Sequence, residues 1–135
     1  MPHLTLEYSP GLAARADIPA LCRALHSAIC EAGIFPLGGI RVRAYCADHA
    51  IVGDGLPEND FAALGFAVAS GRSPEALRAA GDLIFAAARQ ALAEPLATPH
   101  FTLSFEIREI NPDLSWKQNS IHARLAGQTK GAAHG

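Results

Sequence analysis

Features that define several common classes of protein are missing from this sequence. Its three cysteines, Cys22, Cys30 and Cys46, are odd in number and form no Cys-x-x-Cys pair, which predicts reduced, buried thiols. The six histidines show no metal-ligand spacing. No apolar run approaches the ~18 residues that a membrane-spanning helix needs, and the first residues lack the regions of a secretory signal. We therefore expect a cytoplasmic protein without a metal site and without a membrane partner.

The sequence motifs of the commonest nucleotide and hydrolase sites are also absent. There is no Gly-x-Gly-x-x-Gly, no P-loop and no Gly-x-Ser-x-Gly. The net charge of −2 gives no basic surface for a nucleic-acid partner. What the chain has instead is apolar side chains, since 50% of its 135 residues are hydrophobic and only 18% are charged. This length favours one domain, and the apolar surplus predicts contact with other subunits.

Alternation of apolar and polar residues predicts a strand at the very start of the chain. Leu4, Leu6 and Tyr8 alternate with polar neighbours. Pro2 stands at the first position of this strand, where proline is tolerated because its missing N–H is not needed there. A second alternating strand, the clearest in the sequence, is expected over residues 101–108.

Two helices are predicted from their end signals. The first is expected to follow Asp17 as its N-cap and to end at Gly33. The second is expected to follow Ser73, with Pro74 at the first helical position, and to run to about Ala93. Apolar residues recur at helical spacing in both segments.

Two further strands complete a β-α-β, loop, β-α-β order. They are expected over 40–46 and 61–70, and the second is so apolar that we expect it to be covered on both faces. Right-handed crossovers would pair parallel strands within each half and put both helices on one face of the sheet. The sequence thus predicts one α+β domain over 1–125, with a bare apolar sheet face that calls for oligomerisation, and a disordered tail over 126–135.

Two arginines on one predicted strand form the first candidate binding site. Arg41 and Arg43 are two residues apart, so both side chains leave the same face, about 6–7 Å from each other. Two guanidinium groups at this spacing suit two carboxylates, or a carboxylate and an oxyanion. The alternative is a solvated strand edge, or an ion pair with Glu7, Glu106 or Glu109.

Arg72 is a second candidate because of its place immediately before a helix N-cap. The free N–H groups and the positive dipole end of a helix already attract anions there. The alternative is an arginine that binds backbone carbonyls in a turn. Near the other end of the chain, Trp116 and Lys117 are candidates to close over a pocket, or to pack the C-terminal segment against a neighbour.

Pro2 becomes a candidate base if Met1 is removed, because its nitrogen is then a free secondary amine. An α-amino group titrates at about 7.7–8.0 in its ordinary environment. A low dielectric and nearby cations both disfavour the charged form and lower that pKa. Arginines beside Pro2 would therefore bind an anionic substrate and also keep the base deprotonated. The alternative is a plain proline at the start of a strand.

Four stretches of the sequence together resemble a known family. They are MPHLTLEYS at the start, GIFPLGGIRVRAY in the middle, SGRS before the second helix and SFEIREINPDLSWKQNSIHARL near the end. In this order they resemble the 5-carboxymethyl-2-hydroxymuconate isomerases of the tautomerase superfamily. The resemblance extends over nearly the whole chain up to Leu125, except for the loop from Cys46 to Asn59.

The resemblance implies a duplicated β-α-β fold with a four-stranded mixed sheet, assembled as a homotrimer. It implies that Pro2 is the catalytic base after methionine removal, and that Arg41 and Arg72 bind a polycarboxylate substrate, with Arg43 and Lys117 as further candidates. No metal and no organic cofactor are implied. The implied reaction is an allylic proton shift in the meta-cleavage branch of homoprotocatechuate (4-hydroxyphenylacetate) degradation.

Two alternatives remain open at this point. One is the same chemistry on another acid, such as 2-hydroxymuconate or an arylpyruvate enol, since a fold alone does not determine a reaction. The other is a non-catalytic trimer that only binds small anions. Retention of Met1 would favour the second, because the nitrogen of Pro2 would then be an amide without basicity.

Overall fold

The computed structural model describes residues 1–134 of the chain, and the side chains of residues 1–128. Four strands form one sheet, and they are β1 (His3–Tyr8), β2 (Arg41–Cys46), β3 (Asp60–Ala69) and β4 (Phe101–Ile110). The helices are α1 (Ile18–Ala32), α2 (Pro74–Ala91), the short α3 (Ala93–Leu96) and α4 (Ser120–His134). Three single 3₁₀ turns connect them, namely η1 (Pro10–Ala14), η2 (Leu37–Gly39) and η3 (Pro112–Leu114).

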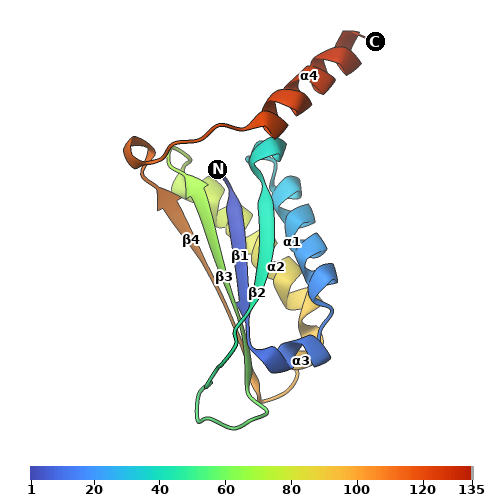
Figure 1. Cartoon of the computed structure of the whole chain (residues 1–135), viewed down its shortest axis with the longest axis vertical. Coiled ribbons are helices and arrows are strands. Elements are labelled where there is room, and N and C mark those ends of the chain that lie inside the picture. Colours follow the sequence, from blue (N-terminus) through green and yellow to red (C-terminus); the bar gives the residue numbers. More distant parts are fainter. Residues whose placement is uncertain (135) are drawn as a thin grey trace.

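The sheet is mixed, and its strand order is β2-β1-β3-β4. β1 pairs with β2 in parallel and β3 pairs with β4 in parallel, whereas the two halves meet through the antiparallel pair β1–β3. This confirms the predicted β-α-β duplication. Figure 1 shows α1 and α2 lying together along one face of the sheet. The core fills the space between them, and its largest buried side chains include Leu4, Leu6, Leu25, Ile29, Phe66 and Ile84.

Local end signals start and stop the two main helices as predicted. The Asp17 carboxylate accepts a hydrogen bond of 3.0 Å from the Ala20 N–H, and α1 ends at Gly33, whose φ of 76° is left-handed. The Ser73 hydroxyl accepts from the Ala76 N–H at 3.1 Å and caps α2. Because Ser73 caps the helix, the residue before it, Arg72, is placed at the start of α2.

The open face of the sheet is polar, which corrects the predicted apolar face. The alternation that buries one side of β1, β2 and β4 sends the polar side chains of all three strands to the other side. That face carries His3, Thr5, Glu7, Arg41, Arg43, Ser104, Glu106 and Arg108. β3 contributes small apolar residues there and β2 the exposed ring of Tyr45. On this face of β3, Ala67 is buried but Ala63 is half-buried and Gly65 is exposed, so the strand is not fully covered on both faces.

The structure also differs from two smaller predictions. The cysteines are free, but Cys30 and Cys46 are exposed and only Cys22 is half-buried, because Cys46 ends the edge strand β2 and Cys30 lies on the solvent side of α1. Residues 126–134 continue α4 where the sequence predicts a disordered tail, and Gly135 lies outside the described residues. Alanine, glutamine and lysine in this segment favour a helix, which points away from the sheet (Figure 1).

Among the residues that the structure describes, no helix combines the length with the apolar character needed to cross a bilayer.

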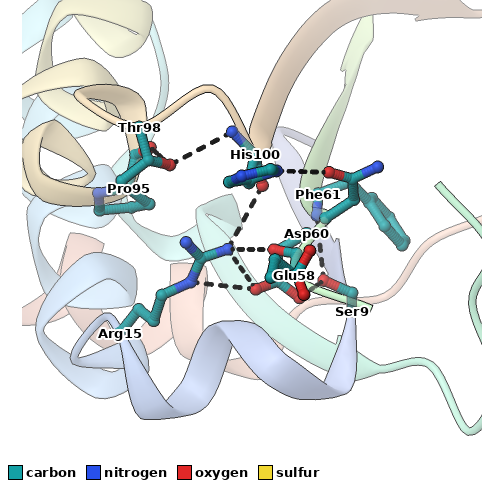
Figure 2. A network of polar contacts seen from close by, with 9 residues as sticks. Ser9, Arg15, Glu58, Asp60, Phe61, Pro95, Thr98 and His100 are labelled. Atoms are coloured by element: carbon teal, nitrogen blue, oxygen red, sulfur yellow. Dashed lines mark hydrogen bonds and ion pairs between the residues drawn. The ribbon is translucent and has the colours of Figure 1, made fainter. Parts of the chain in front are cut away.

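A buried polar network fixes the end of the sheet where the long loop 47–59 returns to β3 (Figure 2). Asp60 is its centre, accepting from the Ser9 hydroxyl at 2.6 Å and from the Arg15 guanidinium at 2.5 Å and 3.1 Å. Arg15 also donates to the carbonyls of Glu58 and His100. The network therefore joins η1, the loop and both strands of the second half.

We expect Asp60→Ala to lower the free energy of unfolding by about 3 kcal/mol. The variant removes one partner of a buried ion pair and leaves the Ser9 hydroxyl without its acceptor. The loss stays at the lower end of the range for such pairs because the Arg15 side chain is 29% exposed and can regain water. Urea unfolding followed by circular dichroism measures it. Asp48→Ala, in an exposed loop, is the control, and equal losses in both variants would contradict the assigned role of the network.

Candidate active site

A pocket of about 380 Å³ opens where the start of β1 meets the C-terminal segment. Five parts of the chain build it: the amino terminus, the η2 turn with the residue before it, the end of β3, the residue before the α2 N-cap, and the segment before and within the first turn of α4. It is lined by Met1, Pro2, Pro36, Gly39, Ala69, Arg72, Lys117, Asn119 and His122. A larger groove of about 710 Å³ runs between α2 and β4, but it contains none of the predicted site residues.

Pro2 is buried at the base of this pocket, directly before β1. Its carbonyl accepts a hydrogen bond of 3.2 Å from the Arg41 N–H, which ties it to β2. A Cβ atom on Gly39 would lie only 3.1 Å from the Pro2 ring, so glycine at this position allows the turn η2 to approach closely. The strand register and Gly39 together fix the position of the Pro2 nitrogen.

The amino terminus lies in a positively charged environment. The pKa of the Met1 amine is lowered from its ordinary value of 8.0, first by burial and then by the charges of Lys117, Arg72 and Arg41. None of the lining residues is acidic. An amine at this end of the chain therefore loses its proton more readily than a solvated one.

Arg72 lines the pocket and also binds backbone carbonyls, as the alternative interpretation of this residue predicts, while anion binding stays a prediction. Its Nε donates to the Ile34 carbonyl at 3.1 Å and one terminal nitrogen donates to the Ala69 carbonyl at 3.1 Å. Its guanidinium carbon lies 4.6 Å from the centre of the Phe35 ring. These contacts use two of the five N–H groups of arginine, so the head is held rigidly while donors remain for an anion in the pocket.

Arg41 and Arg43 share one face of β2, as their spacing predicts, but neither lines the pocket. Arg41 is exposed at the edge and acts on the terminal amine only through its charge. Arg43 contacts the His3 ring at 3.3 Å instead of a carboxylate. Burial and these two arginines lower the pKa of His3, which favours its neutral ring. In the described residues the one ion pair is Arg15–Asp60.

Residues of the C-terminal segment complete the pocket, and only one of them was predicted. Lys117 lines it, whereas Trp116 is exposed away from it. Asn119 and His122 were missed, because nothing in their spacing shows that they contact the Leu37–Gly39 turn. A Cβ atom on Gly38 would lie 2.5 Å from the His122 backbone, so the Gly-Gly pair is the one sequence signal of a close approach.

The described residues include no group of three or more histidine, cysteine, aspartate or glutamate side chains that could hold a metal ion.

The comparison with known proteins decides the family. Residues 2–125 match the family model of 5-carboxymethyl-2-hydroxymuconate isomerase. This chain belongs to that family. It is 35% identical over 125 residues to 5-carboxymethyl-2-hydroxymuconate Delta-isomerase of Escherichia coli, a match that covers 91% of this chain and 98% of that protein. The chain is therefore an isomerase, and the predicted resemblance is confirmed.

Solved structures agree with the family and with the fold. A 5-carboxymethyl-2-hydroxymuconate isomerase from Deinococcus radiodurans R1 superposes with a TM-score of 0.85 at 38% identity, over 92% of this chain and 93% of that one. A fused 4-OT wild-type symmetric trimer superposes with a TM-score of 0.63 at 16% identity, over 86% of this chain and 93% of that one. The second likeness shows the tautomerase fold alone.

Proposed function

We propose that this isomerase converts 5-carboxymethyl-2-hydroxymuconate into its conjugated 2-oxo-enoate isomer, with the free amine of Pro2 as the base. The observation that carries the proposal is the position of the amino terminus, which lies in a pocket with Arg72 and Lys117 and has a lowered pKa. Removal of Met1 would leave the secondary amine of Pro2 among the same cations. The curated relative from Escherichia coli supplies the substrate.

The proposed reaction moves one proton and shifts the double bonds of a dienol. The Pro2 nitrogen takes the proton from the 2-hydroxyl, the C2–O bond becomes a carbonyl, and the double bond shifts to C3–C4. The protonated amine then returns a proton to C5 and is ready for another cycle. Arg72 and Arg41 bind carboxylates and stabilise the negative charge on the dienolate oxygen and the 1-carboxylate.

We also propose that the chain works as a homotrimer in homoprotocatechuate degradation. The half-covered β3, together with the polar groups beside it, leaves a sheet face that a neighbouring subunit would cover. The fold neighbour solved as a symmetric trimer supports the same assembly. Arg41 and Arg43, which lie outside the pocket of a single chain, would then be placed at a subunit boundary. A cytoplasmic location remains a prediction.

The proposed function is tested with a series of three acids. We expect the highest kcat/KM for 5-carboxymethyl-2-hydroxymuconate, a lower one for 2-hydroxymuconate and the lowest for an arylpyruvate enol, each followed by ultraviolet absorbance. A preference for the arylpyruvate would favour the same chemistry on another substrate. Failure to accelerate any of the three, by protein whose mass shows that Met1 is absent, would favour a trimer that only binds anions.

Lys117→Gln is expected to raise the pKa of the Pro2 amine. Like charges disfavour the protonated form, so removal of Lys117 shifts the pKa back towards its ordinary value, and the acid limb of kcat/KM moves to higher pH. Burial and the charges of Arg72 and Arg41 remain and keep part of the shift. Titration of the ¹⁵N-labelled Pro2 nitrogen by NMR measures the pKa without substrate. A pKa equal in wild type and variant would contradict this prediction.

A further inference from the structure

The side chain of Asn119 hydrogen-bonds the C-terminal segment to the pocket. Its amide nitrogen donates to the Gly38 carbonyl at 2.8 Å and contacts the sulfur of Met1 at 3.8 Å. Its amide oxygen accepts from the His122 N–H at 2.9 Å and so caps α4. Asn119 is half-buried, whereas its neighbours Gln118 and Ser120 are exposed.

The opposite side of this contact is shaped to receive the segment. The turn η2 packs against α4, and a side chain at Gly38 would collide with the backbone of His122. After η3 the chain crosses the end of the sheet, meets η2 and leaves the domain as α4 (Figure 1). Asn119 therefore sets the position of the residues on either side of it.

Those residues give the pocket a second polar wall, which carries the charge of Lys117. Lys117 and His122 line it from the C-terminal segment, while Arg72 lines it from the start of α2. Arg72 is fixed by its two carbonyl contacts beside the predicted base. Besides its effect on the amine, a second wall that carries Lys117 provides a separate binding point, which suits an acid with a further carboxylate away from the reacting atoms.

We propose that Asn119 is a positioning residue that selects for polycarboxylates, because it holds Lys117 and His122 where they bind a carboxylate remote from the reacting atoms. The inference rests on the proposed function and goes further, since it names the part of the chain that distinguishes among related acids. Asn119 also lines the pocket, but its amide nitrogen and oxygen are engaged by the Gly38 carbonyl and the His122 N–H, so it acts through its neighbours.

The experiment compares two substrates and two variants. Asn119→Ala removes both the cap and the contact with Gly38, whereas Asn119→Ser keeps a hydroxyl that can cap α4 but cannot reach Gly38. Because a charge-assisted contact is lost, we expect both variants to lower kcat/KM for 5-carboxymethyl-2-hydroxymuconate by about tenfold to a hundredfold, mainly through KM. For a monocarboxylate arylpyruvate enol the change is expected to stay below about threefold.

Matched controls separate this role from general effects on the segment. Gln118→Ala truncates a neighbouring exposed amide, and Arg124→Gln removes an exposed cation from α4 that does not line the pocket. Both are expected to leave the ratio of kcat/KM for the two substrates unchanged. Lys117→Gln is expected to lower kcat/KM for 5-carboxymethyl-2-hydroxymuconate relative to that for the arylpyruvate enol. It is expected to add little to this loss when combined with Asn119→Ser, because the two changes remove the same contact.

Calorimetric titration with propane-1,2,3-tricarboxylate and with propanoate gives a readout that does not depend on turnover. Asn119→Ser is expected to weaken binding of the tricarboxylate by about tenfold and to leave propanoate unchanged. Equal losses for both acids would reduce Asn119 to a structural role, and no loss for either would overturn the inference. If the tricarboxylate result holds while no substrate is turned over, the proposed reaction fails and the selectivity stands.

Discussion

Protein that retains Met1 is expected to isomerise 5-carboxymethyl-2-hydroxymuconate at least about a hundredfold more slowly than the same chain beginning at Pro2. The nitrogen of Pro2 is an amide while Met1 is attached, and an amide cannot accept the hydroxyl proton. Positioned general bases contribute about 10²–10⁴-fold to a rate. Preparations separated by intact mass and assayed side by side measure the difference.

Met1 also fills part of the pocket, so a second variant is needed to separate loss of the base from obstruction. Pro2→Ala, processed to begin at residue 2, leaves a free primary amine at the same end of β1 and an unobstructed pocket. We expect it to be slower than wild type and faster than the Met1 form. Turnover by Pro2→Ala equal to that of wild type would show that the mechanism does not need the proline ring. Turnover by the Met1 form equal to that of wild type would show that it does not need the free amine.

Replacement of Arg72 is expected to have the second largest effect. Arg72→Lys should lower kcat/KM by about 10²–10³-fold, the loss typical of one group that stabilises a developing oxyanion. Lysine carries the charge but lacks the planar fork, so it cannot hold the Ile34 and Ala69 carbonyls and also present a donor to the substrate. Steady-state kinetics below the melting temperature measure the loss.

Arg72→Lys also has a structural cost, since two carbonyls lose their partner. Each unsatisfied group costs about 1–3 kcal/mol if it stays buried, and thermal unfolding records that loss separately. Arg23→Lys, on the exposed side of α1, is the control. A variant that melts earlier but turns over normally would show that Arg72 only holds the turn together.

Local signals explain why so much of the fold was predictable. The helix limits at Asp17, Gly33 and Ser73 depend on one residue and its immediate neighbours, and each cap forms as expected. The strands follow from alternation, which is visible within a few residues. The polar open face was not predicted because it is not a local feature. The polar residues of three strands share one face only once the strands are placed side by side.

The candidate site shows the same difference between local and long-range features. Pro2 and Arg72 were predicted as site residues because a strand start and a helix N-cap are local features, and the structure places both in the lining of one pocket. The contact between Asn119 and Gly38 joins residues 81 positions apart and leaves no periodic pattern in the sequence. The network around Asp60 was missed for the same reason, since Ser9 lies 51 positions away from it.

The central claim is that this chain is an isomerase whose free Pro2 amine works on 5-carboxymethyl-2-hydroxymuconate. The most direct measurement is the rate at which protein of confirmed N-terminal mass, beginning at Pro2, ketonises that acid, followed by ultraviolet absorbance. The account predicts a rate far above that of the buffer alone, falling as the pH drops below the lowered pKa of the amine. A rate equal to that of buffer, from folded protein without Met1, would contradict it.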